Sequence, residues 1–373
     1  MKILYFTRAY NSHDYRFLSG LAGAGEQVSY LTLERGRQVL EDRALPPQVE
    51  LLSWSRPPEQ ARLADGGWML GELRRLLRQV QPDLLLAGPL QRSALLAALA
   101  GFHPLIGMSW GYDLLIDAPR SAWWQRATRF TLKRSAALLG DCATVRDLAV
   151  SYGMPAERIV TFPWGVDLAH FSPAAEAPHD PGRPFTMLCT RSWEPVYGVD
   201  VLAKAFILAA QQRPEMRLVL LGGGSQAGLL RQALAGLGPL HTLQGSFERV
   251  LFPGQAAFAD LPRYYRSADL YVSPSHSDGA SISLLEAMAC GVPALVSDIP
   301  GNREWIVSGE NGWLFRDGDP HALAQAILHA AAQRERLPEM GRAARRTAEQ
   351  RADWSKNFPK LYDVFEIALN GTH

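Results

Sequence analysis

The chain alternates short apolar runs with longer segments in which apolar residues recur at helical spacing. In the first half, five mainly apolar runs predict buried strands: Lys2–Thr7, Val28–Leu33, Leu84–Ala87, Leu105–Ser109 and Ala137–Gly140. Between the second and third runs, apolar residues recur every three or four positions from Trp68 to Val80, and arginines occupy the opposite face. Strands and helices in alternation predict a parallel sheet with helices on both sides.

The second half repeats this pattern. Its predicted strands are Phe185–Cys189, Arg217–Leu221, Val250–Pro253, Asp269–Val272 and Pro293–Val296. Helical patterns follow at Ala322–Ala332 and Met340–Arg351, and a last apolar stripe runs from Trp354 to Phe365. The sequence therefore predicts an α/β protein with two doubly wound, Rossmann-like domains.

A proline-rich stretch without apolar periodicity, Pro173–Pro184, has the composition of a linker. We therefore expect an N-terminal domain at 1–172, a linker at 173–184 and a C-terminal domain at 185–354. The segment 355–373 is expected to pack back on the first domain. Open parallel sheets bind ligands beyond the carboxyl ends of their strands, so two facing sheets predict a central cleft with one binding wall on each domain.

Composition and charge narrow the function classes. Hydrophobic residues make up 47% and charged residues 20%, as in folded globular proteins. With 38 basic and 37 acidic residues the formal charge is +1, which gives no overall attraction to nucleic acid. The three cysteines, Cys142, Cys189 and Cys290, lack the spacing of a disulfide framework or a metal site. No signal peptide or membrane span is predicted, so we expect a cytoplasmic protein.

The most informative stretch is Ser273–Trp305, SPSHSDGASISLLEAMACGVPALVSDIPGNREW. Small residues from Gly279 to Ser283 lead into a predicted helix at Leu284–Cys290. Free amides at a helix N-terminus, together with the helix dipole, favour phosphate binding. Glu286, in the first turn, is placed to accept hydrogen bonds from a ribose. Together these features predict a sugar-nucleotide pocket.

The same stretch resembles the signature of the retaining GT-B glycosyltransferases of family 4, in which two glutamates separated by seven residues precede A-M-A-C/S-G-x-P. FPWGVDLAHFSP at Phe162–Pro173 is similar to the segment between the domains of that family. Arg191 with Gly198–Asp200 resembles the diphosphate-binding segment, and Leu220–Gly224 resembles the L-x-G-x-G turn. Trp110, Gly111 and Asp113 stand where the family carries H-G-x-D.

The resemblance implies hexosyl transfer from a nucleoside diphosphate sugar with retention of configuration, without a metal or another cofactor. UDP or GDP donors are favoured, and the implied acceptors are carbohydrates or lipid-linked carbohydrates of polysaccharide, lipopolysaccharide or glycolipid synthesis. Arg191, Asp278 and Glu286 would be the catalytic residues, acting on the diphosphate, the donor sugar and the ribose. The implied donor-binding residues are Arg191, Gly222, Gly223, Asp278, Gly279, Ala280, Ser281, Ile282, Ser283 and Glu286.

Several positions depart from the family pattern. The first acid is Asp278 instead of Glu, and Tyr197 stands beside Gly198 where a lysine is usual. The N-terminal loop lacks the usual glycine pair but is polar and follows the first strand. We therefore expect acceptor-side residues on the first domain, namely His13, Asp14, Arg16, Trp110 and Asp113.

The segment Arg120–Arg134, RSAWWQRATRFTLKR, combines five basic residues, no acidic residue and several aromatic residues. Such a helix is typical of contact with an anionic membrane surface, although tryptophans on a helix often face the core. This segment predicts a peripheral association with the inner face of the membrane.

Two other functions remain open from the sequence. A sugar-nucleotide epimerase of the same shape would bind the same donor, but its expected acid and base residues are not identifiable here. A non-catalytic sugar-nucleotide binding protein would fit the missing lysine and the tryptophan at position 110.

Overall fold

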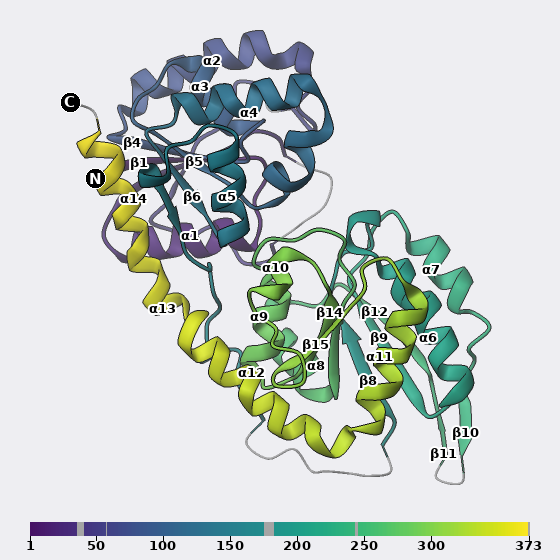
Figure 1. The fold of residues 1–373 in the computed structure, drawn as a ribbon. Coiled ribbons are helices and arrows are strands. Elements are labelled where there is room, and N and C mark those ends of the chain that lie inside the picture. The colour runs from purple at the N-terminus through teal and green to yellow at the C-terminus, as the bar shows by residue number, and fades with distance from the viewer. Residues whose placement is uncertain (36–40, 57, 175–182, 243–244, 372–373) are drawn as a thin grey trace. The chain divides into compact units, whose positions relative to one another are not determined.

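The computed structural model describes residues 1–35, 41–56, 58–174, 183–242 and 245–371, and the chain divides into two compact units. Unit 1 comprises Met1–Trp164 and Ser355–His373, and unit 2 comprises Gly165–Trp354 (Figure 1). The division at Gly165 places the predicted linker in unit 2, and residues 175–182 of that linker lie outside the described residues.

Unit 1 is built on a seven-stranded parallel sheet with the order β3-β2-β1-β4-β5-β6-β7. The strands are β1 (Lys2–Thr7), β2 (Gln27–Thr32), β3 (Glu50–Leu51), β4 (Leu84–Ala87), β5 (Leu105–Met108), β6 (Ala137–Gly140) and β7 (Ile159–Thr161). The helices are α1 (Ser12–Gly23), α2 (Gly66–Val80), α3 (Ser93–Ala100), α4 (Ala122–Arg134), α5 (Ala143–Ser151), α13 (Trp354–Asn357), which begins at the last residue of unit 2, and α14 (Leu361–Asn370).

Unit 2 contains a six-stranded parallel sheet, β12-β9-β8-β13-β14-β15, and a separate antiparallel pair. Its strands are β8 (Phe185–Cys189), β9 (Met216–Leu221), β10 (Leu240–Thr242), β11 (Gly245–Phe247), β12 (Val250–Gly254), β13 (Leu270–Ser273), β14 (Ala294–Ser297) and β15 (Gly312–Phe315). Its helices are α6 (Val199–Gln212), α7 (Ala227–Leu234), α8 (Leu261–Ser267), α9 (Ile282–Ala289), α10 (Pro300–Arg303), α11 (Pro320–Ala332) and α12 (Leu337–Arg351).

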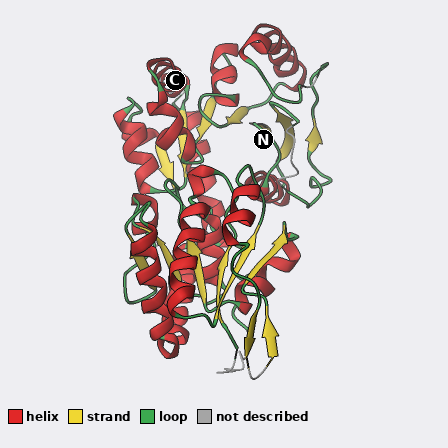
Figure 2. Ribbon diagram, turned by 90° about the vertical axis from the view of Figure 1, so that its right-hand side faces the viewer, coloured by secondary structure: helices red, strands yellow, loops and turns green. Residues whose placement is uncertain are grey.

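The predicted fold class is confirmed, because each unit is a parallel sheet with helices on both faces (Figure 2). All ten predicted strands form, with ends shifted by one residue at most. The sequence prediction missed the short strands β3 and β7, the antiparallel pair β10 and β11, and the edge strand β15. The central strands are nearly continuous apolar runs that are buried on both faces, as parallel sheets require.

The last helix of the chain belongs to unit 1. Leu361, Val364, Phe365 and Ala368 of α14 are buried, and the helix packs against β5, β6 and β7. Before it, the chain passes close to the start of unit 2, where the Val166 N–H donates to the Ala352 carbonyl at 2.7 Å. The Trp354 N–H donates to the Val166 carbonyl at 3.1 Å, so the two connections between the units are hydrogen-bonded to each other.

Candidate donor-binding and acceptor-side sites

The strand order of the parallel sheet in unit 2 reverses at β8. Strand β9 pairs with one side of β8, and β13 pairs with the other. Ligands of open α/β sheets bind beyond the carboxyl ends of strands at such a point. Arg191 follows β8, Gly222 follows β9, and Asp278 lies in the loop between β13 and α9. The fold therefore brings together three segments that are far apart in the sequence.

Arg191 is the centre of this site. Its Nη2 forms a 2.8 Å ion pair with Oδ2 of Asp278, and its Nη1 donates to the hydroxyls of Ser281 at 2.9 Å and Ser283 at 3.1 Å. The guanidinium carbon also lies 4.2 Å from the centre of the Tyr197 ring. These contacts hold the side chain in one orientation.

Burial and charge act in opposite directions on this pair. Burial lowers the pKa of Arg191, but the Asp278 carboxylate, together with the smaller contributions of Tyr197, Tyr271 and Cys189, outweighs burial, so the net shift is upward. Burial also raises the pKa of Asp278, while the nearby guanidinium lowers it. The Nε of Arg191 is buried and has no hydrogen-bond partner within the described part of the chain. One strong donor therefore remains available to an anionic ligand.

The helix α9 carries the second part of the site. Ser281 is its N-cap and is buried, but its side chain makes no capping hydrogen bond with the described residues; its hydroxyl instead accepts from Arg191. The first amides of α9 thus stay without that cap, at the end of the helix that attracts anions. The prediction that Glu286 lies in the first turn is wrong, because α9 begins at Ile282 and Glu286 is in its second turn. Glu286 is 7% exposed, and its Oε2 accepts a 2.7 Å hydrogen bond from the Tyr265 hydroxyl.

Glycines allow the surrounding loops to approach closely. Gly222 has a φ of +106°, and a Cβ there would lie 3.4 Å from the Arg191 carbonyl. The Gly223 carbonyl accepts from the Trp193 N–H at 2.9 Å, which ties the turn after β9 to the loop after β8. A Cβ at Gly301 would meet the Asp278 carbonyl at 2.5 Å, so α10 also packs tightly on the loop that carries Asp278.

The structure thus brings Arg191, Asp278, Ser281 and Ser283 into direct contact, with Glu286 on the same helix as the two serines. Gly279 and Ala280 lie between the members of this group, and Ile282 is the first residue of α9. The sequence did not identify the contribution of three tyrosines. Tyr197 stacks on Arg191, Tyr265 bonds Glu286, and the Tyr271 hydroxyl donates to Ser283 at 2.7 Å. Only Tyr197 could have been found from the sequence, because it stands where the family usually carries a lysine.

The acceptor-side candidates of α1 lie in different environments. Asp14 is fully buried and completes a capping box with Asn11, whose backbone N–H donates to it at 2.9 Å. Burial raises the pKa of Asp14 to about 8. Arg16 is 8% exposed, whereas His13 is half-buried, and its ring lies edge-on to Trp164 at 4.8 Å. Only His13 of these three has a substantially exposed surface, and acceptor contact stays a prediction for all of them.

The other two candidates follow β5. The Trp110 ring lies edge-on to Trp164 with centroids 5.9 Å apart, and its Nε1 is buried without a hydrogen-bond partner among the described residues. Asp113 is 1% exposed and accepts from the Leu90 N–H at 3.0 Å and the Ser109 hydroxyl at 2.7 Å. Burial raises the pKa of Asp113 to about 6. Asp113 therefore braces two loops, and Trp110 is the better placed to meet a ligand.

The basic segment forms the exposed face of α4. Ala127, Thr128, Thr131 and Leu132 are buried, while Arg126, Arg129, Lys133 and Arg134 are exposed. Trp123 is 48% exposed, and its neighbour Trp124 is half-buried. Among the described residues, no helix is both long and apolar enough to cross a bilayer.

Comparison with known proteins identifies related sequences on both units. Residues 184–333 match the family profile described as "Glycosyl transferases group 1", and residues 11–170 match the profile described as "Glycosyltransferase Family 4". The D-inositol 3-phosphate glycosyltransferase of Thermobispora bispora is 31% identical over 237 residues, which are 61% of this chain and 55% of that protein. The phosphatidyl-myo-inositol mannosyltransferase of Mycobacterium leprae is 32% identical over 233 residues, which are 61% of this chain and 59% of that protein. The chain thus spans little more than half the length of these relatives.

Solved structures agree on the fold. HepE of Anabaena in complex with UDP-glucose superposes with a TM-score of 0.79 at 20% identity, over 98% of this chain and 99% of that chain. The lipopolysaccharide outer core galactosyltransferase WaaB superposes with a TM-score of 0.66 at 16% identity, over 98% of this chain and 99% of that chain. At these identities the likeness concerns the fold alone.

Proposed function

Because the chain belongs to the group 1 and family 4 glycosyltransferases with the GT-B fold, we propose that it transfers a sugar from a nucleoside diphosphate sugar to a hydroxyl group of an acceptor. The observation that carries this proposal is the arrangement around Arg191. A buried guanidinium, one N–H of which has no hydrogen-bond partner among the described residues, lies next to the N-terminus of α9. A diphosphate there would meet both sources of positive charge.

The roles of the site residues follow from their chemistry. Arg191 binds the diphosphate and stabilises the negative charge that develops on it as the bond to the sugar breaks. The backbone amides of Gly279–Ser283 contact phosphate and sugar, and Asp278 accepts hydrogen bonds from sugar hydroxyls. Glu286 accepts hydrogen bonds from the ribose, because its carboxylate is held on the same helix as those amides. Gly222 and Gly223 give the donor close access to the backbone.

The reaction proceeds with retention of configuration and without a metal or another cofactor. The acceptor hydroxyl attacks from the side of the leaving group, and the departing phosphate takes the acceptor proton, so no protein nucleophile is required. Positioning and charge stabilisation then supply the rate acceleration. UDP is the first donor nucleotide to test, because HepE binds UDP-glucose on the same fold, and GDP is the second.

The acceptor is a carbohydrate or a lipid-linked carbohydrate of polysaccharide, lipopolysaccharide or glycolipid synthesis. Relatives named for inositol 3-phosphate and phosphatidyl-myo-inositol support a polar acceptor with a lipid-linked form. His13 and Trp110 contact it, while the buried Asp14, Arg16 and Asp113 act as positioning residues beneath them. The exposed basic face of α4 attaches the protein to the inner face of the membrane from the cytoplasm.

A thermal-shift panel of UDP, GDP, ADP and their sugars tests the donor proposal, since a ligand that binds the folded state raises the unfolding temperature. We expect one nucleotide and its sugar to shift the midpoint, and the same sugar nucleotide to be consumed when acceptor sugars are added. Isomerisation of the donor sugar would indicate an epimerase instead. Binding without any turnover or donor hydrolysis would indicate a non-catalytic sugar-nucleotide binding protein.

A further inference from the structure

Unit 2 contains a cavity of about 580 Å³ at the amino-terminal end of its sheet. Asp269, just before β13, and Pro293, just before β14, lie in its wall, together with Cys290 and Gly291 after α9. Arg191 and Asp278 follow the opposite ends of β8 and β13. The cavity is therefore separate from the proposed donor site, and its volume is in the range of small-molecule pockets.

Six arginines line this cavity. They come from the start of β8, from α8, from the turn before α12 and from α12 itself: Arg183, Arg266, Arg334, Arg342, Arg345 and Arg346. Among the described residues of the lining, Asp269 is the only acidic one, and Glu349 pairs with Arg345 from the side at 2.7 Å. In the part of the chain that the structure describes, six guanidinium groups against these two carboxylates leave four positive charges in excess.

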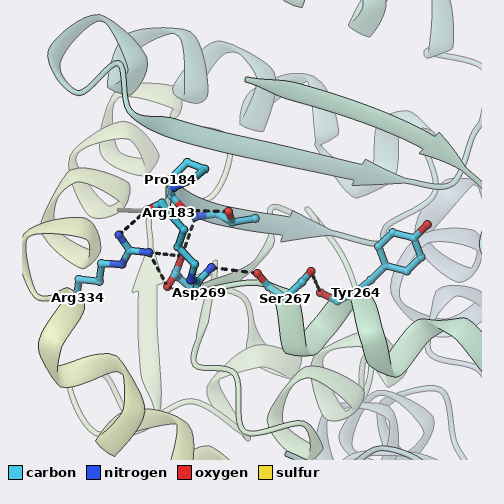
Figure 3. A network of polar contacts seen from close by, with 7 residues as sticks. Arg183, Pro184, Tyr264, Ser267, Asp269 and Arg334 are labelled. Carbon is cyan, nitrogen blue, oxygen red and sulfur yellow. Dashed lines mark hydrogen bonds and ion pairs between the residues drawn. The ribbon is translucent and has the colours of Figure 1, made fainter. Parts of the chain in front are cut away.

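Three of the six arginines are held in place by ion pairs or hydrogen bonds within unit 2. Arg183 and Arg334 converge on the buried carboxylate of Asp269, at 2.6 and 3.3 Å (Figure 3). The Nη1 of Arg334 also donates to the Arg183 carbonyl at 3.0 Å. Arg345 donates to the carbonyls of Phe171 at 2.8 Å and Ala289 at 2.6 Å. These three side chains form a fixed wall whose orientation is set before any ligand arrives.

The other three arginines are exposed. Arg266, Arg342 and Arg346 form no ion pair with a carboxylate of the described residues, and Arg342 and Arg346 project from the same helix. In addition, the Nε of the fixed Arg334 is buried without a hydrogen-bond partner in the described part of the chain. Guanidinium N–H donors are therefore available both on the fixed wall, from Arg334, and at the exposed edge of the cavity, from Arg266, Arg342 and Arg346.

Guanidinium groups bind phosphate through two parallel N–H donors, and they lose little hydration in doing so. The lining also contains apolar side chains, among them Val292, Pro293 and Leu337, which suit the carbon skeleton of a ligand. We propose that this arginine cavity is a second ligand site of unit 2, which binds a soluble small molecule carrying two or more phosphate groups. The ligand is distinct from the sugar donor, because it enters at the other end of the sheet.

Calorimetric titration of the full chain with inorganic pyrophosphate at low salt tests this proposal. Four proteins are compared: the wild type, Arg191→Ala, the pair Arg342→Gln/Arg346→Gln, and the control pair Arg213→Gln/Arg316→Gln, which removes the same charge outside the cavity. We expect the cavity pair to raise the dissociation constant at least about tenfold. The control pair and Arg191→Ala should retain binding at the cavity, so failure of the donor proposal leaves this result unchanged.

Sedimentation with phosphatidic acid vesicles separates a soluble ligand from a lipid headgroup. Three results would overturn the proposal: no pyrophosphate binding by the wild type, equal losses in the two pairs, or loss of vesicle binding alone in the cavity pair. Equal unfolding midpoints of the two pairs exclude misfolding as the cause of a difference. Since Arg342 and Arg346 are exposed and form no ion pair with a described carboxylate, we expect the cavity pair to fold. The control pair should also fold, because the ion pair that Arg213 forms with Glu215 at 2.8 Å is solvent-exposed and contributes little to stability.

Discussion

The guanidinium of Arg191 lies 2.8 Å from the carboxylate of Asp278, and the two residues follow neighbouring strands of one sheet. Each is the other's counter-charge in a largely buried position, where an unpaired charge is costly. The ion pair with Asp278 keeps Arg191 oriented before the donor arrives. In the proposed reaction the diphosphate then becomes a second anion beside the guanidinium.

Replacing Arg191 by alanine should lower turnover more than affinity. We expect kcat to fall about 10²- to 10³-fold, since the guanidinium acts on charge that develops in the transition state. Steady-state kinetics with the donor found in the thermal-shift panel measures this effect. The variant also leaves Asp278 without its partner and should lose about 3 kcal/mol of stability.

The double variant Arg191→Ala/Asp278→Asn separates the two effects, because it removes both charges. It should recover most of the lost stability but none of the lost turnover. If Arg191→Ala alone retained wild-type kcat, Arg191 would have no role in catalysis. Tyr197→Leu should lower kcat by a smaller factor, because it removes only the ring beneath the guanidinium.

Glu286→Ala should weaken nucleotide binding about 10- to 100-fold, because a ribose would lose hydrogen bonds to a charged acceptor. Calorimetric titration with the nucleoside diphosphate measures the change. Tyr265→Phe is the matched control, since it keeps the carboxylate and removes only the hydroxyl that donates to it. Equal nucleotide affinities of Glu286→Ala and the wild type would show that Glu286 does not bind the ribose.

Asp14 gives a prediction about pH. Its pKa is raised to about 8 in the folded protein by burial, against about 3.9 in an unfolded chain. Between these values the folded state keeps a proton that the unfolded state releases, so stability should decrease as pH rises from about 4 to 8. The slope from this one group is at most about 1.4 kcal/mol per pH unit.

Asp14→Asn should remove this contribution, because the amide oxygen still accepts the Asn11 N–H but does not titrate. Urea unfolding of both proteins at several pH values measures the difference. A variant that is no more stable relative to the wild type at pH 8 than at pH 5 would contradict the raised pKa.

The exposed face of α4 gives a prediction about membranes. Replacing Arg126, Arg129, Lys133 and Arg134 by glutamine should weaken sedimentation with anionic vesicles at least about tenfold, since each basic residue near such a surface contributes about 1 kcal/mol. A control variant changes four exposed arginines on or before α2 instead: Arg56, Arg74, Arg75 and Arg78. Unchanged binding of the α4 variant would show that this face does not contact the membrane.

The sequence predicted the sheets well because their strands are buried on both faces and therefore apolar throughout. It missed β15, Gly312–Phe315, since a four-residue edge strand carries little pattern. The contact partners of Arg191 were only partly visible. The acid and the serines lie in one recognisable stretch, but Tyr265 and Tyr271 reach Glu286 and Ser283 from elements whose sequence shows no sign of a site.

Two of the predicted acceptor-side residues, Asp14 and Asp113, are buried and not exposed as the sequence suggested. Asp14 and Asp113 follow strand ends, where polar residues commonly face solvent or ligand, yet both are buried because backbone N–H groups pair with them. The arginine cavity was not predictable at all. Its six arginines lie between positions 183 and 346, and only the packing of α8 and α12 at the amino ends of the strands gathers them.

The return of α14 to unit 1 also has a consequence for synthesis. The ribosome completes β1–β7 long before it makes the helix that covers β5, β6 and β7, because all of unit 2 is translated in between. The apolar surface that receives Leu361, Val364 and Phe365 therefore stays open while unit 2 is being made. Nascent unit 1 consequently exposes an aggregation-prone apolar surface during this interval, and shortening the chain by α14 would make that exposure permanent.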